Sequence, residues 1–400
     1  MDKKYIKMWN NCLANRTERM KGSAIRELLK LTQMPGVISF AGGWPAPELF
    51  PVREFEEAAR YWLPREGDKM LQYSVTEGLP PLKDFLVDYM KRYNVPAEPE
   101  NILLTNGSQQ ALDLIGKVFL NEGDKIIVSE PTYLGALQAW NSYGPQYVTV
   151  KMDEKGMVVE QVEKLLKKDK IKFIYVLPNF HNPAGTTLPL ERRKKLTDLV
   201  KKYDTFIVED DPYGELRYEG EDLAPIISLL KEKVIYLSTF SKTLSPGIRL
   251  GWITAPASVM EKFVQAKQAV DLHTGTLVQY LAWDLCHRGI LRAHVKELRE
   301  VYKRRRDVML ESMEKYFPKG VKWTKPEGGL FLWVIVPKGI DMKKLLDKAV
   351  KLKVAYVPGA EFHANGGGEN TFRLNFSNAK EDKIVEGIKR LGKLLKEAIG

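Results

Sequence analysis

A lysine that follows a short apolar run is the residue of this sequence best placed to do chemistry. In "YLSTFSKTLSPGIRLGW", residues 236–252, Lys242 stands between two hydroxyl residues and precedes a Pro-Gly-x-Arg turn. Lysine is usually a solvated surface charge, so a chemical role needs partners. Three are near in sequence: the hydroxyls of Thr239 and Ser241, and Arg249, whose guanidinium can bind a phosphate through two parallel hydrogen bonds.

A second candidate anion site lies in "NILLTNGSQQAL", where Gly107, Ser108 and Gln109 open a stretch with helical spacing. The first turn of a helix presents free backbone N–H groups and the positive end of the helix dipole, and both favour a phosphate. Taken alone, an ordinary strand-to-helix turn with Ser108 as the helix cap is the commoner interpretation.

Three further segments end in groups that suit a flat, polar ring. Asp210 in "FIVEDDPY" could cap a helix or could hold a ring nitrogen protonated, with Tyr213 one turn beyond it. Asn182 in "PNFHNPAG" could form a turn or could hydrogen-bond a phenolic oxygen. Tyr133 in "SEPTY" could pack in the core or could stack on the ring.

All these groups follow apolar runs, which predict the elements that position them. Each run of four to six apolar, β-branched residues ends in polar or glycine-rich residues and is followed by a helical pattern. Runs without alternation are typical of strands buried on both faces. We therefore predict an α/β fold with a mainly parallel sheet flanked by helices, and a ligand at the carboxyl ends of its strands.

The flanking segments have a different texture. They contain Arg-rich helical stretches, the strand pattern "GGLFLWVIV" and a last amphipathic helix. The apolar face of that helix is formed by Ile384, Ile388, Leu391 and Leu395. This mixture indicates a smaller α+β domain. We predict a segment 1–45 that belongs to this small domain and gates the substrate, a large cofactor-binding domain 46–290, and a C-terminal small domain 291–400.

Together the candidate groups match one ligand. A phosphate cradle, an aromatic face, an amide, a carboxylate and a lysine suit a phosphorylated pyridine aldehyde, and Lys242 would form the Schiff base with pyridoxal 5′-phosphate. The sequence resembles the fold-type I pyridoxal-phosphate aminotransferases of class I, in the branch with 2-aminoadipate, kynurenine and aromatic aminotransferases. The resemblance runs from "ISFAGGWPAPELFP" to "FRLNFSN", and "STFSKTLSPGIRLGW" is its most specific motif.

The resemblance implies a role for each residue. It makes Lys242, Asp210 and Tyr133 the catalytic residues, with Asp210 pairing the ring nitrogen and Tyr133 stacking on the ring. Asn182 and Tyr213 would bond the phenolic oxygen. The phosphate would be held by Gly107, Ser108, Gln109, Thr239, Ser241 and Arg249, and by Tyr73 of a neighbouring subunit, so the active unit is expected to be a homodimer.

The resemblance also implies the substrate contacts. Arg373 would clamp the α-carboxylate together with Asn182 and the backbone at Gly43. Arg26, in "GSAIRELLKLTQMPG", would turn toward an acidic side chain or away from a bulky apolar one. Trp44 is a departure from the family, whose members usually carry an aliphatic residue there, and it leaves the side-chain specificity open.

The expected reaction moves the amino group of an aromatic, kynurenine, 2-aminoadipate or branched-chain amino acid to 2-oxoglutarate by a ping-pong mechanism. One alternative is β-elimination or decarboxylation on the same scaffold. Another is an aminotransferase-like transcription regulator, but the segment before Gly42 is too short for an added DNA-binding domain. The five histidines have no H-E-x-x-H spacing and no G-x-S-x-G motif is present, which argues against a metal or serine hydrolase.

Composition narrows the setting. The 400 residues carry a net charge of +11, but 62 basic residues are interleaved with 51 acidic ones, which is typical of solvated surface rather than of nucleic-acid binding. Two cysteines, Cys12 and Cys286, fit a reducing compartment. With no apolar run of membrane-spanning length, we expect a cytoplasmic enzyme without a metal, a nucleic-acid partner or a membrane contact.

Overall fold

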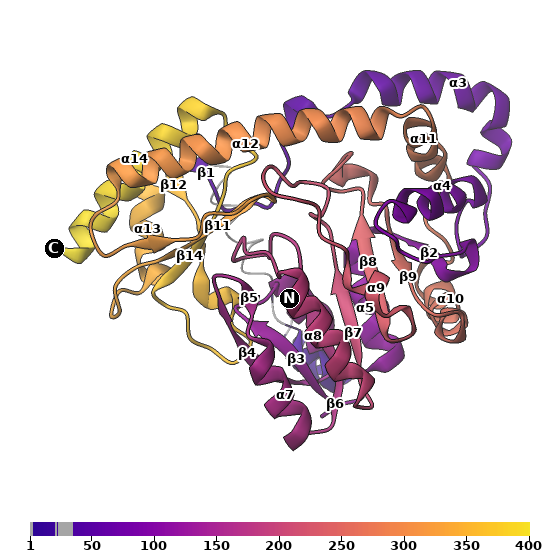
Figure 1. Ribbon diagram of the computed structural model, residues 1–400, viewed down its shortest axis with the longest axis horizontal. Coiled ribbons are helices and arrows are strands. Elements are labelled where there is room, and N and C mark those ends of the chain that lie inside the picture. The colour runs from indigo at the N-terminus through magenta and orange to yellow at the C-terminus, as the bar shows by residue number, and fades with distance from the viewer. Residues whose placement is uncertain (1–2, 21, 23–34) are drawn as a thin grey trace.

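The computed structural model describes residues 3–20, 22 and 35–400, and its largest element is an eight-stranded sheet (Figure 1). In sheet order, its strands are β2 (Ile102–Thr105), β9 (Gly251–Thr254), β8 (Val234–Thr239), β7 (Phe206–Asp210), β6 (Ile171–Val176), β3 (Lys125–Glu130), β4 (Gln146–Asp153) and β5 (Gly156–Met157). The neighbours from β8 to β4 pair in parallel, whereas β9 and β5 run antiparallel to their partners. The predicted mainly parallel sheet is confirmed.

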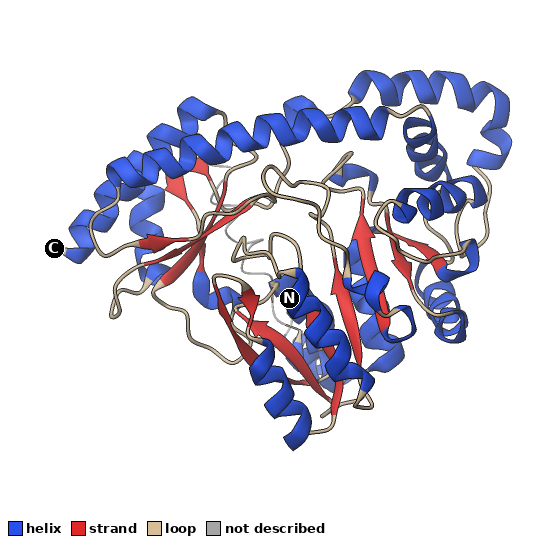
Figure 2. Cartoon of the chain, in the orientation of Figure 1, coloured by secondary structure: helices blue, strands red, loops and turns tan. Residues whose placement is uncertain are grey.

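Helices cover both faces of this sheet (Figure 2). The helices that pack on one face are α5 (Gly107–Phe119), α6 (Leu134–Asn141) and α10 (Ala257–Asp271). Those on the other face are α4 (Pro80–Lys91), α7 (Val159–Lys168), α8 (Leu190–Lys201), α9 (Ile226–Leu229) and α11 (Thr276–His287). Burial on both faces explains why the strands are continuous apolar runs.

Two smaller sheets lie beside the large one (Figure 1). One is antiparallel, in the order β10 (Lys322–Trp323), β11 (Phe331–Ile335), β14 (Thr371–Asn375) and β13 (Val357–Pro358). The other pairs β1 (Ile38–Ser39) in parallel with β12 (Val354–Ala355), so a segment near the start of the chain joins a segment near its end. The boundaries proposed at residues 45 and 290 stay predictions.

A long helix connects the two parts of the molecule. In Figure 1, α12 (Ile290–Tyr316) runs from α11 across to the small sheets, and α14 (Glu381–Ile399) lies against it. The predicted apolar face of this last helix is confirmed, since Ile384, Ile388, Leu391 and Leu395 are fully buried. The remaining elements are α1 (Lys3–Cys12), α3 (Val52–Met70), α13 (Met342–Lys351) and the short 3-10 helices η1 (Asn15–Arg19), η2 (Pro47–Leu49), η3 (Pro99–Asn101), η4 (Lys231–Lys233), η5 (Pro246–Ile248) and η6 (Gly359–Phe362).

Candidate active site

Lys242 lies just beyond the carboxyl end of β8, and its side chain reaches toward the small sheets. Its Nζ donates a hydrogen bond of 2.8 Å to the carbonyl oxygen of Gly43. Burial, and then the guanidinium groups of Arg373 and Arg249, lower the pKa of Lys242 to about 8. An amine with this pKa is partly neutral near pH 8 and can act as a nucleophile or a base.

The residues predicted to hold the phosphate come together from two strand ends. Gly107 opens α5 with a φ of +73°, and a Cβ added there would lie 2.6 Å from Nη2 of Arg249. Arg249 donates to Oγ of Ser241 at 3.4 Å, and Thr239 donates to the same oxygen at 2.9 Å. Two hydroxyls, one guanidinium and the amino end of a 13-residue helix therefore converge, which is the donor set that a phosphate requires.

The two residues after Gly107 differ in what their side chains do. Ser108 is half-buried in the first turn of α5. Gln109 is exposed, and its Nε2 donates to the carbonyl oxygen of Gly135 at 2.8 Å, which ties α5 to α6. The structure thus gives the Gln109 side chain a structural bond, and its predicted phosphate contact stays a prediction.

Asp210 is the last residue of β7 and is almost fully buried, with 1% of its surface exposed. Its Oδ2 accepts a hydrogen bond of 2.7 Å from the hydroxyl of Tyr175, while Oδ1 has no hydrogen-bond partner among the described residues. Burial raises the pKa of Asp210 to about 7, and the bond from Tyr175 opposes that rise. A cationic N–H donor would satisfy Oδ1 and stabilise the ionised carboxylate.

Asn182 and Tyr213, which the resemblance assigns to one oxygen of the cofactor, meet at the same edge of the sheet. Nδ2 of Asn182 donates to the hydroxyl oxygen of Tyr213 at 3.3 Å. Tyr133 precedes α6 and is half-buried, and burial raises its pKa to about 12. Burial also raises the pKa of Tyr213, so both tyrosines are neutral at physiological pH and can donate a hydrogen bond.

Arg373 enters the site from β14 in the small sheet. Its Nη1 donates to Oδ1 of Asn182 at 2.8 Å, and its Nη2 donates to the carbonyl oxygen of Ala41 at 2.7 Å. The guanidinium lies over the ring of Phe331 at 4.2 Å and near that of Phe362 at 5.0 Å. Burial lowers its pKa to about 10, so it keeps its charge at neutral pH.

The other predicted substrate and subunit contacts are less enclosed. Trp44 is 41% exposed, and its ring occupies the space beside Gly42. Tyr73 is 79% exposed, and its ring meets that of His273 edge to face. Arg26 lies outside the described residues.

The residues that converge here fit pyridoxal 5′-phosphate. The space that a Cβ at Gly107 would fill adjoins the guanidinium of Arg249, as a phosphate cradle requires. The unpartnered Oδ1 of Asp210 suits a ring N–H, and Nε of Arg373 is also buried without a partner among the described residues. Buried polar groups are normally hydrogen-bonded, so the acceptor Oδ1 calls for an N–H donor and the donor Nε calls for an acceptor such as a carboxylate oxygen.

Sequence reasoning missed three residues of this site. Tyr175 is the one hydroxyl-bearing residue in the apolar run of β6, and this was a usable signal. Phe331 and Phe362 flank the Arg373 guanidinium, but nothing in their local sequence distinguishes them from core phenylalanines. Their place beside Arg373 depends on how β11 pairs with β14 and on how η6 packs beside β14.

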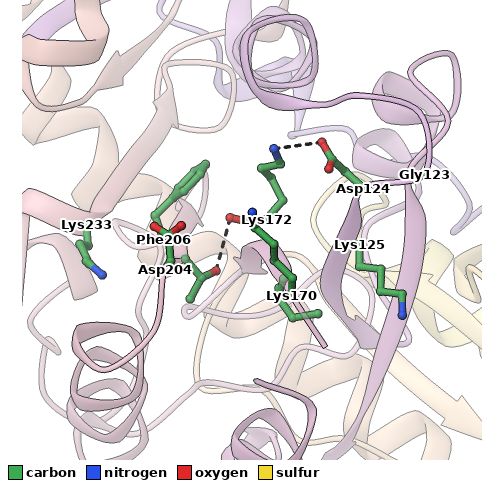
Figure 3. Close-up of a pocket in the computed structure, with 10 residues that line it drawn as sticks. Gly123, Asp124, Lys125, Lys170, Lys172, Asp204, Phe206 and Lys233 are labelled. Atoms are coloured by element: carbon green, nitrogen blue, oxygen red, sulfur yellow. Dashed lines mark hydrogen bonds and ion pairs between the residues drawn. The ribbon is translucent and has the colours of Figure 1, made fainter. Parts of the chain in front are cut away.

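A separate hollow of about 600 Å³ opens at the amino ends of the strands, away from this site (Figure 3). Four lysines line it: Lys125, Lys170, Lys172 and Lys233. Lys172 lies 3.1 Å from Asp124, and Lys125 pairs with Asp169. Lys233 donates to two backbone carbonyls. Three of the four charges are thus already bound within the protein, and none of the predicted site residues lines the hollow.

Neither a metal cluster nor a membrane-spanning helix is present in residues 3–20, 22 and 35–400. Over this part of the chain, no group of three or more His, Cys, Asp or Glu side chains is arranged to hold a metal ion. Within the same residues, no helix is both long and apolar enough to cross a membrane.

Comparison with known proteins gives consistent matches over nearly the whole chain. The model of the aminotransferase class I and II family matches residues 46–391. Aromatic-amino-acid aminotransferase 1 of Thermococcus litoralis is 50% identical over 385 residues, which cover 94% of this chain and 92% of the relative.

Solved structures agree with this match. Kynurenine aminotransferase of Pyrococcus horikoshii, in complex with PMP, has a TM-score of 0.94 and 47% identity, over 98% of each chain. The α-aminoadipate aminotransferase of Thermus thermophilus, complexed with N-(5′-phosphopyridoxyl)-L-leucine, has a TM-score of 0.92 and 42% identity, over 98% of this chain and 99% of that one.

Proposed function

The chain belongs to the family of class I and II aminotransferases, and we propose that it moves the amino group of an α-amino acid to 2-oxoglutarate by a ping-pong mechanism. The protein is an aminotransferase, and its cofactor is pyridoxal 5′-phosphate. The proposed donors are aromatic amino acids, kynurenine, 2-aminoadipate or branched-chain amino acids, and the names of its relatives cover the first three.

The observation that carries this proposal is the pair of guanidinium groups that flank Lys242. Arg249 belongs to the phosphate cradle, whereas Arg373 bonds the segment at Ala41, two residues before the carbonyl that Lys242 bonds. Both charges lower the pKa of the lysine. An amine between two anion-binding groups suits a reaction that joins a phosphorylated aldehyde with an amino acid carrying an α-carboxylate.

Within this proposal the residues have separate tasks. The bound cofactor supplies an aldehyde carbon and an electron-withdrawing ring. Arg249, Ser241 and Thr239 would hold its phosphate, and Oδ1 of Asp210 would hold its ring nitrogen in the protonated form. The neutral Nζ of Lys242 would act first as a base, which takes the proton from Cα of the amino acid. The ammonium group so formed would then act as an acid and give that proton up again.

Substrate selection has two further proposed components. Arg373 and Asn182 bind the α-carboxylate, which every amino acid and oxo acid presents. Trp44, half-exposed next to Gly43, offers an aromatic face to aromatic donors. The proposed gating by Arg26 stays a prediction from the sequence.

We also propose a homodimer in the cytoplasm. Tyr73, 79% exposed, lies close in sequence to two other exposed apolar residues, Leu71 and Val75, and such a group of exposed apolar side chains favours contact with another chain. Cys12 and Cys286 are both free thiols, in keeping with a reducing compartment.

One assay tests the reaction. The purified protein is incubated with each of the twenty amino acids plus 2-oxoglutarate, while cofactor absorbance and glutamate are followed. We expect glutamate to form with aromatic and related donors, and parallel double-reciprocal plots when both substrates vary. Release of ammonia without glutamate would instead identify elimination, and converging plots would contradict the ping-pong order.

A further inference from the structure

Tyr175 and Asp210 form a buried contact that the proposed reaction does not by itself require. The hydroxyl of Tyr175 donates to Oδ2 of Asp210 at 2.7 Å, and their exposed fractions are 0% and 1%. Tyr175 lies in β6 and Asp210 ends β7, so the bond crosses between neighbouring parallel strands.

The register of the sheet explains why these two side chains meet. Tyr175 of β6 pairs with Val208 of β7, and Asp210 lies two residues after Val208 in β7. The side chains of all three residues therefore point to one face of the sheet. Two residues of a parallel strand advance about 6.6 Å, and a tyrosine can span this with its ring. A phenylalanine at this position would fill the same space but would donate nothing.

The direction of the Tyr175 hydroxyl is held by packing. The ring of Trp140, in α6, meets the Tyr175 ring edge to face, with centroids 5.0 Å apart and an interplanar angle of 89°. Trp140 is itself anchored, because its Nε1 donates to the carbonyl oxygen of Leu112 in α5 at 2.8 Å. Helices α5 and α6, which begin at Gly107 and directly after Tyr133, therefore also hold Tyr175 in place.

We propose that Tyr175 is a positioning residue for Asp210, which occupies Oδ2 so that Oδ1 is presented to the ring nitrogen of the cofactor. This inference rests on the proposed function. Without the tyrosine hydroxyl, the carboxylate would have no donor on either oxygen among the described residues and would be free to rotate about its Cβ–Cγ bond.

Electrostatics act in the same direction. The titratable groups that face Asp210 are Tyr175 from β6, Asp211 beside it, and Tyr133 and Tyr213 across the site. Burial and the charge of Asp211 raise the pKa of Asp210, and the bond from Tyr175 is the one that lowers it. Loss of the hydroxyl therefore raises this pKa further, so the carboxylate ionises only at a higher pH.

The test compares Tyr175→Phe with a matched control, Tyr356→Phe. Tyr356 is also fully buried and also donates one hydrogen bond of 2.7 Å, but to the backbone oxygen of Met342 in the small part of the molecule. Pyridoxal 5′-phosphate is titrated into each cofactor-free protein and followed by absorbance, at pH values on both sides of 7. Thermal unfolding of each protein is measured in parallel.

We expect Tyr175→Phe to raise the dissociation constant of the cofactor about tenfold to a hundredfold, as for one hydrogen bond to a charged group, and to move the pH dependence of binding upward. Tyr356→Phe should bind like the wild type while losing similar thermal stability. In the Asp210→Asn background, Tyr175→Phe should add no further loss of affinity.

Two results would overturn the inference. One is an unchanged dissociation constant with an unchanged pH dependence in Tyr175→Phe, and the other is a full additional loss of affinity in the Asp210→Asn background. If Tyr175→Phe fails to fold, the same titration is made with Trp140→Phe, which leaves the hydroxyl in place but loosens its direction, and unchanged binding there overturns the inference too. A wild-type protein that binds no cofactor would contradict the proposed function instead.

Discussion

The side-chain nitrogen of Lys242 lies 2.8 Å from the carbonyl oxygen of Gly43. This bond connects the carboxyl edge of the large sheet to the segment that follows β1. Strand β1 pairs with β12 and so belongs to one of the two smaller sheets. The lysine that would carry the cofactor thus rests on the backbone proposed to receive the substrate carboxylate. Attachment of the cofactor to Nζ would replace this hydrogen bond, whereas a substrate carboxylate, itself an acceptor, would meet the N–H of Gly43 and not its carbonyl oxygen.

Lys242 should be the single point of covalent attachment for the cofactor. Borohydride reduction of the loaded enzyme should fix the cofactor to Lys242, and attachment to the cofactor-free protein should accelerate as the pH rises through about 8, where the amine loses its proton. Peptide mass spectrometry locates the adduct. Lys267 is an internal control, because it is fully buried but paired with Asp271 at 2.8 Å. An adduct on Lys267 or any other lysine would refute the assignment.

Asp210→Asn should reduce turnover about a hundredfold or more, which corresponds to a few kcal/mol of transition-state stabilisation. The amide has the same shape but cannot hold a ring nitrogen in its protonated form by charge. Steady-state rates measure the loss, and circular dichroism should show an unchanged fold. Asp211→Asn is the neighbouring control: its carboxylate accepts from Asn179 and Tyr236, so we expect it mainly to lower thermal stability. Wild-type turnover in Asp210→Asn would show that the nitrogen is held otherwise.

The stability of the cofactor-free protein should depend on pH through Asp210. Its folded-state pKa of about 7 lies above the ordinary value of 3.8, so the folded state binds the proton more tightly than the unfolded state does. This contribution to the free energy of unfolding is fully present below about pH 4 and is lost as the pH rises through about 7.

The side chain introduced by Asp210→Asn stays neutral at every pH. The free energy of unfolding of this variant, relative to the wild type, should therefore increase between about pH 4 and about pH 7 and level off above that. Urea unfolding at several pH values measures the difference. Asp347→Asn, the same substitution at an exposed position, serves as the control for the change of side chain. A constant difference between Asp210→Asn and the wild type across the whole range would mean that the ionised carboxylate is not penalised in the folded state.

Gly107→Ala should weaken binding of the cofactor phosphate. The new methyl group would lie 2.6 Å from Nη2 of Arg249, at a φ of +73° that already disfavours a side chain. We expect the dissociation constant for pyridoxal 5′-phosphate to rise about tenfold or more, as for loss of one charge-assisted hydrogen bond, and that for pyridoxal to change little. Gly123→Ala has a similar φ of +85° but open space around it. Equal losses in the two variants would attribute the effect to backbone strain alone.

Arg373→Ala should weaken every amino acid and every 2-oxo acid by a similar factor. All of them present the same α-carboxylate, and a guanidinium that already bonds Asn182 can meet it through two donors. We expect KM to rise about tenfold or more for each substrate, as for one charge-assisted pair, with kcat changed less. Kinetics with phenylalanine, leucine and glutamate provide the comparison. A loss confined to one side-chain class would place Arg373 at the side chain instead.

Much of the site could be predicted because its residues follow strands whose ends lie at one edge. In parallel strands the carboxyl ends meet automatically, so Lys242, Asp210 and Asn182 needed only the correct assignment of three apolar runs. Gly107 was recognisable for a local reason as well, since a glycine that opens a helix after a strand indicates a close approach by another group.

Contacts that depend on register or on packing between sheets were decided by the tertiary structure. Two consecutive acids of β7 illustrate this. Glu209 points to one face of the sheet and accepts hydrogen bonds from the backbone N–H groups of Ile226 and Ile227. Asp210 points to the other face and accepts one from Tyr175. Alternation along a strand separates neighbouring side chains, but the partner of each is set by the neighbouring strand.

Arg373 is the clearest case of the same limit. Sequence resemblance marked it as the carboxylate clamp, but its bond to Asn182 crosses 191 positions of the chain. Phe331 flanks it because β11 pairs with β14, and Phe362 lies near it because η6 packs beside β14. The sequence by itself determined the order of strands and helices and the residue types at the strand ends, since these follow from local periodicity. Only the tertiary structure decided which buried groups satisfy one another, because that depends on the joint packing of segments far apart in the chain.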